Sequence, residues 1–196
     1  MRRPLRVALL VGAALGVAAA TARGRGRALD DRLYKRVNTD LQHPALDAAL
    51  GAVTELGSMW ASIGAAAALA ASGRKRVARD AVGAAGAMWI LGQALKRRYG
   101  RARPFDSPAP GRLLIGKPAG TSWPSSHPAV LTAFVTVAAR GLRLSRATRV
   151  GLAALAGAVG ASRVYLGVHY PSDVAGGLLL GRALGDAWPD GSPASR

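Results

Sequence analysis

The sequence predicts an all-α integral-membrane bundle of about six transmembrane helices. Half of its 196 residues are hydrophobic, yet only 5% are aromatic. Alanine, glycine, leucine and valine carry the apolar content, as in membrane helices, whose backbones approach closely where side chains are small. The apolar residues also gather in runs bordered by basic residues, which is the arrangement expected of membrane spans and their anchors.

Six apolar segments define the expected helices. They comprise residues 5–22, 57–72, 78–95, 129–142, 150–162 and 174–188. Several are shorter than the roughly 20 residues that a spanning helix prefers, but flanking arginine and tryptophan side chains can extend their reach. A buried bundle in water is the alternative. Residues 150–161 argue against it, because a solvent-facing helix would carry charged residues and this stretch has none.

The first segment has two interpretations. Met1-Arg2-Arg3, the apolar run and the small residues up to Ala22 describe a signal peptide as well as a transmembrane helix. We favour an uncleaved helix. The next region is polar as far as Glu55, and four apolar residues spaced in it and directly after it predict an amphipathic helix at the membrane interface. These residues are Leu46, Leu50, Val53 and Leu56.

The chain is expected to form one membrane domain over residues 1–196. Residues 1–22 would form the first helix or signal-like segment, residues 57–188 the catalytic helical core, and residues 189–196 a disordered tail. Cysteine is absent. This absence excludes disulfides, thiolate metal sites and cysteine nucleophiles.

The formal net charge of +17 indicates an anionic partner. Such a charge is typical of proteins that bind nucleic acid or anionic lipid. The basic residues of this chain flank apolar runs, as in Arg74-Lys75-Arg76 and in the arginines between residues 140 and 149. We therefore expect membrane lipids as partners and no nucleic acid.

Three polar clusters lie at the ends of apolar segments. They are Lys96 with Arg103-Pro104, then Pro124-Ser125-Ser126-His127, and finally Ser162-Arg163 with His169 and Asp173. If successive helices alternate in direction, these ends lie on one face of the membrane. The sequence therefore predicts that the three clusters converge.

The assembled residues suit a phosphate group. Lys96, Arg103 and Arg163 supply positive charge, and arginine binds phosphate oxygens with its forked donors. A helix that opens at residues 125–127 offers free backbone N–H groups to an anion.

Two histidines complete the cluster. His127 and His169 can act as acid, base or nucleophile near neutral pH. Asp173 is close enough in the sequence to hydrogen-bond His169, and such a partner fixes the tautomer of an imidazole and stabilises its charged form.

The three motifs resemble the signature of the type-2 phosphatidic acid phosphatase superfamily. That signature comprises a Lys and an Arg-Pro six residues apart, a Pro-Ser-Gly-His, and a Ser-Arg followed by His and Asp. The residues that match are Lys96, Arg103, Pro104, Pro124, Ser125, His127, Ser162, Arg163, His169 and Asp173. The second motif departs at one place, because Ser126 stands where glycine is usual, and serine disfavours positive φ.

The resemblance implies a role for each residue. His169 would attack phosphorus and form a phosphohistidine, Asp173 would orient His169, and His127 would protonate the leaving oxygen and then activate water. The phosphoryl oxygens would be held by Lys96, Arg103, Ser125, Ser126 and Arg163. No metal and no other cofactor would be needed, because these cations stabilise the transition-state charge. The few, scattered acidic residues also differ from a two-metal site.

The remaining polar residues and glycines receive structural interpretations. Arg97, Arg98 and Arg101 are interpreted as membrane anchors at a helix end. His43 and Asp47 are interpreted as structural or interfacial residues. Gly176 and Gly177 are expected to serve helix packing.

The expected function is hydrolysis of a polyprenyl phosphate or diphosphate, or of a related lipid phosphate, in the bacterial plasma membrane. The alternatives are a phosphatidylglycerol-phosphate phosphatase, a phosphatase of a polyprenyl-phosphoryl-sugar phosphate such as decaprenylphosphoryl-5-phosphoribose, and a lipid phosphotransferase. A membrane scaffold with a decayed site is the non-enzymatic alternative. The short basic loops at residues 74–76 and 140–149 are expected in the cytoplasm, which would place the active site outside it.

Overall fold

The computed structural model describes residues 2–108 and 110–189, and this part of the chain is helical without a strand. The helices are α1 (Arg3–Ala20), α2 (Gly24–Lys35), α3 (Pro44–Glu55), α4 (Met59–Ala71), α5 (Lys75–Tyr99), α6 (Ser126–Gly141), α7 (Arg146–Tyr165) and α8 (Pro171–Ala187). A π-helical turn (Arg36–Asp40) and a 3₁₀ turn (Pro104–Asp106) add to them. The all-α prediction is confirmed, and each of the six apolar segments is a helix. Of the predicted tail, only Pro189 lies within the described residues.

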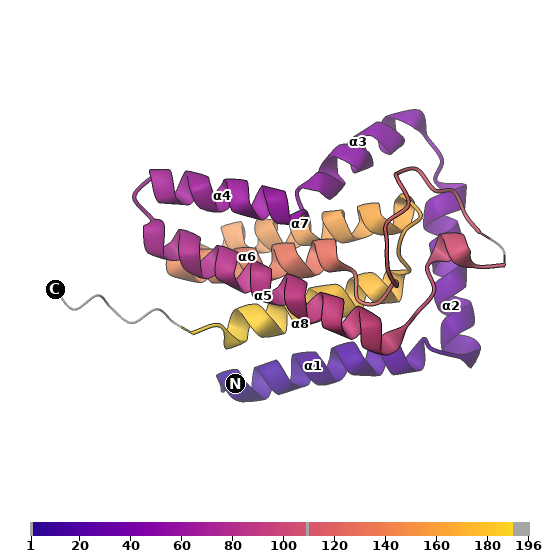
Figure 1. The fold of residues 1–196 in the computed structure, drawn as a ribbon, viewed down its shortest axis with the longest axis horizontal. Helices are drawn as coiled ribbons and strands as arrows, with labels where there is room; N and C mark the ends of the chain where they lie inside the picture. Colours follow the sequence, from indigo (N-terminus) through magenta and orange to yellow (C-terminus); the bar gives the residue numbers. More distant parts are fainter. Residues whose placement is uncertain (1, 109, 190–196) are drawn as a thin grey trace.

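The long helices lie side by side, and α2 and α3 lie at one end of the bundle (Figure 1). At this end, which we call the loop end, the connection between α5 and α6 and the connection between α7 and α8 come together. The α4–α5 and α6–α7 turns and the start of α1 lie at the opposite end, which we call the turn end. The alternating direction of α5 to α8 therefore brings the three polar clusters to the loop end.

Small residues form the contact between α6 and α8. A Cβ atom added at Gly177 would lie 2.4 Å from the carbonyl oxygen of Ser125, and one added at Gly181 would lie 2.3 Å from that of Ala129. A Cβ atom added at Gly176 would lie 2.5 Å from Nε1 of Trp123, in the loop just before α6. These distances support the packing role expected of Gly176 and Gly177, because a larger side chain would push α8 away from α6.

We expect Gly177→Ala to lower the stability of the protein by about 1–3 kcal/mol, the usual cost of overpacking a closely packed contact. Gly157→Ala is the matched control, because a Cβ atom at Gly157 in α7 meets no atom within 4 Å. That control should be neutral or slightly stabilising, since alanine favours helices over glycine. Thermal unfolding of both variants in detergent measures the difference. Equal melting temperatures would contradict this description of the α6–α8 contact.

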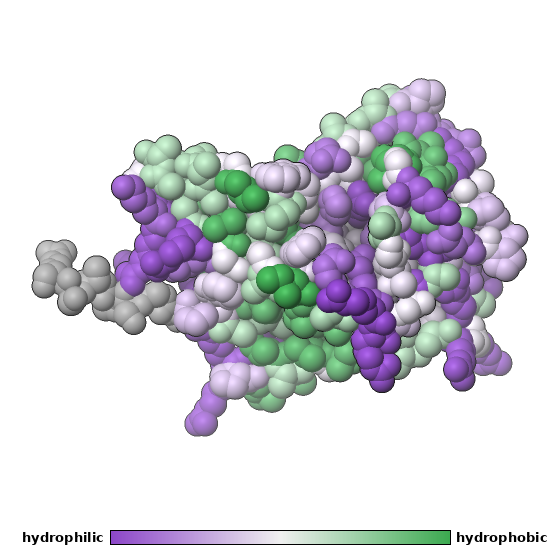
Figure 2. All heavy atoms as spheres, viewed as in Figure 1, coloured by the Kyte–Doolittle hydropathy of each residue, from purple (hydrophilic) through white to green (hydrophobic). Residues whose placement is uncertain are grey.

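Hydrophobic side chains are exposed on the sides of the bundle. Trp60, Ile90 and Val150 have exposed fractions of 80%, 65% and 61%. On the face seen in Figure 2, hydrophobic residues gather mainly along the middle, with hydrophilic residues toward the two ends. By length and hydropathy, α1 is the one described helix that could cross a membrane, and α4 is apolar but has only 13 residues. The count of six spans therefore stays a prediction.

The region between α1 and α4 has mainly structural roles. The predicted amphipathic helix is α3, on which Leu46 is exposed, as is Leu56 directly after it. His43 caps this helix, because its Nδ1 accepts a hydrogen bond from the backbone N–H of Ala45 at 3.2 Å. Asp47 connects α3 to the loop between α5 and α6, because its carboxylate accepts a hydrogen bond from the guanidinium of Arg112 at 2.9 Å. These contacts agree with the structural interpretation of His43 and Asp47.

Candidate active site

His169 lies in the short connection between α7 and α8 and is almost fully buried. The chain turns at Gly167, whose φ of +86° is a conformation that other residues rarely adopt. A Cβ atom at this glycine would also lie 1.9 Å from the carbonyl oxygen of Arg112. The backbone N–H of His169 then donates to the carbonyl oxygen of Arg163 at 3.3 Å, which fixes the loop against the end of α7.

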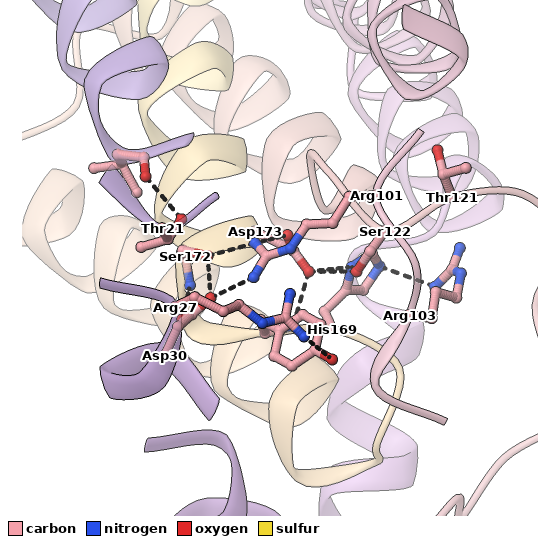
Figure 3. Close-up of polar contacts among 12 residues, drawn as sticks. Thr21, Arg27, Asp30, Arg101, Arg103, Thr121, Ser122, His169, Ser172 and Asp173 are labelled. Carbon is pink, nitrogen blue, oxygen red and sulfur yellow. Dashed lines mark hydrogen bonds and ion pairs between the residues drawn. The ribbon is translucent and has the colours of Figure 1, made fainter. Parts of the chain in front are cut away.

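The two ring nitrogens of His169 face different partners (Figure 3). Nδ1 lies 3.5 Å from Oδ2 of Asp173 and 3.4 Å from Oγ of Ser122. Nε2 lies 3.4 Å from Nη1 of Arg103. Because a guanidinium can only donate, Nε2 has to be the acceptor, and the ring proton belongs on Nδ1 beside the carboxylate. The free electron pair on Nε2 therefore faces the cationic side of the site.

The surroundings keep His169 neutral. Burial, together with the charges of Lys96 and Arg103, lowers the pKa of His169 to about 3, although the neighbouring Asp173 acts in the opposite direction. At neutral pH the imidazole thus has an electron pair available without first losing a proton.

Asp173 is fully buried in the first turn of α8 and accepts hydrogen bonds from several directions. The backbone N–H of Tyr170 donates to its Oδ2 at 2.8 Å, and the hydroxyl of Ser122 donates to the same oxygen. Nη1 of Arg101 donates to Oδ1 at 2.7 Å. The carboxylate is therefore held in place beside His169 and has its negative charge paired.

Arg101 connects Asp173 to α2. Besides Asp173, it donates to Oγ of Ser172 at 2.6 Å and to Oδ2 of Asp30 at 2.6 Å (Figure 3). Asp30 in turn accepts from the backbone N–H of Ser172 at 3.0 Å. The interpretation of Arg101 as a membrane anchor is therefore wrong: its side chain is mostly buried and pairs with two carboxylates.

The ring of Tyr170 supports this network from the side. The guanidinium carbons of Arg27 and Arg101 lie 4.3 Å and 4.4 Å from its centroid. Arg27 also donates to the hydroxyl of Tyr170 at 2.7 Å. These cation–π contacts help to hold α2 and Arg101 next to the loop that carries His169.

Arg103 and Lys96 are positioned by backbone carbonyls of the loop before α6 and, for Arg103, also by one in the connection between α7 and α8. Arg103 donates to the carbonyl oxygens of Gly120 at 2.8 Å, Val168 at 3.0 Å and Ala119 at 3.2 Å. Lys96 lies at the end of α5 and donates to the carbonyl oxygen of Thr121 at 3.0 Å, while the hydroxyl of Thr121 donates back to the carbonyl oxygen of Lys96. Both cations are buried near His169.

Three polar atoms of the predicted phosphate site lack a partner. The hydroxyls of Ser125 and Ser126 and Nε of Arg163 are buried and make no hydrogen bond within the described residues. The other side of the Arg163 guanidinium donates to the hydroxyl of Thr54 at 2.8 Å. Buried polar atoms are almost always paired in folded proteins, so this set indicates a place for the oxygens of a ligand.

Ser126 begins α6, and the one positive φ among the described residues other than glycine is that of Arg143. Serine therefore fits this position, where the family motif usually has glycine. His127 follows in the first turn, within electrostatic reach of Arg163, Lys96 and Arg103. It makes no hydrogen bond to the described part of the chain, so its ring is available to a ligand.

The structure thus brings the eight predicted site residues to one end of the bundle and adds Arg101, Asp30 and Ser122. Arg101 lies within the first motif, two residues before Arg103, but the sequence does not distinguish it from the other basic residues there. Asp30 had no signal in the sequence, since 71 residues separate it from Arg101. Within residues 2–108 and 110–189, no group of three or more His, Asp or Glu side chains could hold a metal ion. The absence of a metal requirement stays a prediction.

A family model of the PAP2 superfamily matches residues 78–189, and the chain belongs to this family. An undecaprenyl-diphosphatase of Sulfolobus acidocaldarius is 37% identical over 94 residues, which are 47% of this chain and 44% of the relative. A decaprenylphosphoryl-5-phosphoribose phosphatase of Mycobacterium tuberculosis is 40% identical over 92 residues, 46% of this chain and 48% of the relative. The chain thus spans less than half the length of these curated relatives.

Two crystal structures share the fold over most of their length. A transmembrane PAP2-type phosphatidylglycerolphosphate phosphatase from Bacillus subtilis superposes with a TM-score of 0.78 at 25% identity, covering 94% of this chain and 92% of that one. LpxE from Aquifex aeolicus superposes with a TM-score of 0.70 at 27% identity, covering 79% and 90%. The all-helical arrangement is therefore that of membrane phosphatases of this family.

Proposed function

We propose that the protein is a metal-independent lipid phosphatase that works through a phosphohistidine on His169. The observation that carries this proposal is the orientation of the His169 ring. Its Nε2 faces Arg103 at 3.4 Å, while Nδ1 faces the buried carboxylate of Asp173 at 3.5 Å. A neutral imidazole that is oriented by a carboxylate and has its free electron pair on the cationic side is suited to attack a phosphorus atom.

In the first step, Nε2 of His169 forms a bond to phosphorus and the bond from phosphorus to the lipid oxygen breaks. The imidazolium form of His127, which the bound anionic phosphate stabilises against the neighbouring cations, donates its proton to that leaving oxygen. Asp173 stabilises the imidazolium of His169 through Nδ1–H. Lys96, Arg103 and Arg163 offset the charge that spreads over the equatorial oxygens. The hydroxyls of Ser125 and Ser126, which are unpaired in the described structure, would donate to the same oxygens.

In the second step, a water molecule attacks phosphorus, His127 takes a proton from it, and the bond between nitrogen and phosphorus breaks. Inorganic phosphate leaves, and His169 is again neutral. The net reaction consumes one water and yields the lipid alcohol, or the lipid monophosphate when the substrate is a diphosphate.

For the substrate we propose a polyprenyl phosphate or diphosphate. Two relatives that are 37% and 40% identical are named for polyprenyl-linked phosphates. Phosphatidylglycerol phosphate is the second candidate, favoured by the Bacillus subtilis structure that aligns with 94% of this chain. Phosphate release by the purified protein from a panel of both lipids distinguishes them. A faster rate on phosphatidylglycerol phosphate would overturn the first choice.

Activity should persist with chelators and be inhibited by vanadate, because the proposed site stabilises phosphate with Lys, Arg and His side chains. Vanadate adopts the five-coordinate geometry of phosphoryl transfer and should bind to Nε2 of His169. The measurement is phosphate release with EDTA, with vanadate and without additive. Activity that falls with EDTA and returns with a divalent metal would show that the mechanism is wrong.

We also propose that the chain spans the membrane about six times and that the loop end lies outside the cytoplasm. The turn end carries short basic connections, and short basic loops favour the cytoplasmic side. Arg74 is in one of them, directly before Lys75 and Arg76 in the first turn of α5. Arg143 is in the other, and Arg146 begins α7.

Cysteines at Ser72 and Ser107 test this orientation, because the native chain has no cysteine. Ser72 is preferable to its neighbour Gly73, whose φ of +82° would strain a cysteine. On intact cells, a membrane-impermeant thiol reagent should label Ser107→Cys and leave Ser72→Cys unlabelled until the cells are opened. The reverse pattern would overturn the proposed orientation.

A further inference from the structure

A basic cavity of about 320 Å³ opens at the turn end, between α1, α6, α7 and α8. Among the described residues, five arginines and one aspartate line it. They are Arg3, Arg6, Arg140, Arg149 and Arg182, with Asp186. The cavity is far from the candidate active site: His127 and Arg140 stand near opposite ends of α6, which places them roughly 20 Å apart along the helix axis.

The one carboxylate of the cavity is already shared. Nε of Arg182 lies 3.0 Å from Oδ2 of Asp186, and Nε of Arg6 lies 3.0 Å from the same oxygen. Arg140 is held elsewhere, donating to the carbonyl oxygens of Gly185 and Trp188 at 2.9 Å each. Among its described lining residues, the cavity therefore has more cationic than anionic side chains.

Two arginines of the cavity have hydrogen-bond donors that are not used within the described residues. Nε of Arg149 donates to the carbonyl oxygen of Leu144 at 2.9 Å. Its terminal nitrogens, and those of Arg182, make no hydrogen bond to the part of the chain that the structure describes. These arginines come from α7 and α8, so an anion could bridge them with forked hydrogen bonds.

Besides the charged residues and two threonines, the lining of the cavity includes apolar side chains. Val135 and Ala139 of α6 and Leu152 and Ala153 of α7 contribute to it. A free phosphate ion would gain nothing from this surface. An amphiphile would, because its acyl chain could cover these side chains while its phosphate meets the arginines.

We propose that this cavity binds the headgroup of an anionic phospholipid in the membrane leaflet at the turn end. The ligand is a phosphodiester such as that of phosphatidylglycerol, which lacks the terminal phosphate that the candidate active site would remove. The bound lipid would join α7 to α8, and so stabilise the end of the bundle that is opposite to the site of chemistry.

The test compares two double variants of the full chain, purified in detergent and freed of lipid. Arg149→Gln with Arg182→Gln removes two charges from the cavity. Arg79→Gln with Arg146→Gln removes two charges from the same end, on side chains that do not line the cavity. Native mass spectrometry and thermal unfolding are measured with phosphatidylglycerol, with phosphatidylethanolamine and with inorganic phosphate.

The wild type should retain phosphatidylglycerol in preference to phosphatidylethanolamine and be stabilised by it. Removal of the two cavity arginines should weaken this binding about tenfold or more, while the control variant binds as the wild type does. Equal weakening in both variants would mean attraction to the whole basic end and no site. Equal stabilisation by millimolar phosphate would mean a site for free anions. Either of these results would overturn the proposal, and so would failure of the wild type to retain phosphatidylglycerol.

Discussion

Replacement of His169 by alanine is expected to abolish turnover. The imidazole is buried and held between Asp173 and Arg103, and the resting tautomer leaves Nε2 as its nucleophilic atom. Removal of a nucleophile typically costs a factor on the order of 10⁴–10⁶ in kcat. The measurement is phosphate release from a lipid phosphate by the purified variant.

His43→Ala is the matched control for this experiment. His43 caps α3 and has no contact with the candidate site, so its loss should leave kcat within about twofold of the wild type while slightly lowering stability. Unchanged thermal unfolding of His169→Ala would show that the lost activity has a chemical cause. Near-normal phosphate release by a folded His169→Ala protein would refute the nucleophile.

Replacement of Arg101 by methionine is expected to lower kcat by roughly 10²–10³-fold, because a removed partner leaves a buried carboxylate with its charge uncompensated. Asp173 would lose its 2.7 Å hydrogen bond and Asp30 its 2.6 Å hydrogen bond. Arg101 is a positioning residue, since it acts on His169 through Asp173. Arg98→Met is the control, because Arg98 is exposed at the end of α5.

The pH profile separates this role from simple loss of stability. Arg101 is a cation close to the pair formed by Asp173 and His169, so its removal favours the imidazolium and raises the pKa of His169. The acid limb of kcat/KM should therefore move to higher pH. Arg101→Lys should restore part of the activity, since an ammonium keeps the charge but cannot reach both carboxylates as a fork does. A variant Arg101→Met that behaves like Arg98→Met would contradict the positioning role.

The helices could be predicted from the sequence because their apolar runs are interrupted by polar loops, but hydropathy placed their ends only approximately. The third segment was predicted over residues 78–95, whereas α5 covers Lys75–Tyr99. It continues through charged residues until Gly100, whose φ of +60° ends the helix. Helix termination there depends on backbone conformation, to which a count of apolar residues is insensitive.

The site could be predicted in part because its residues occur in three ordered motifs. The network of Arg101 and Asp30 that supports Asp173 could not be predicted. In the sequence Arg101 stands among the basic residues 97, 98 and 103, where an anchor and a buried ion pair look the same. What distinguishes Arg101 is contact with Asp30 on α2, and that contact depends on the tertiary packing of α2 against the start of α8.

The formation of a phosphoryl group on His169 is the most direct test of the proposed mechanism. The His127→Gln variant, which should hydrolyse the intermediate slowly, is mixed with a lipid diphosphate, whose phosphate leaving group depends little on an acid. The reaction is quenched in base, where phosphohistidine is stable, and the peptides are examined by mass spectrometry. We predict a phosphoryl group on His169 and none when His169 is also replaced. Steady phosphate release with a phosphoryl group on another residue, or on none at any time in the reaction, would contradict it.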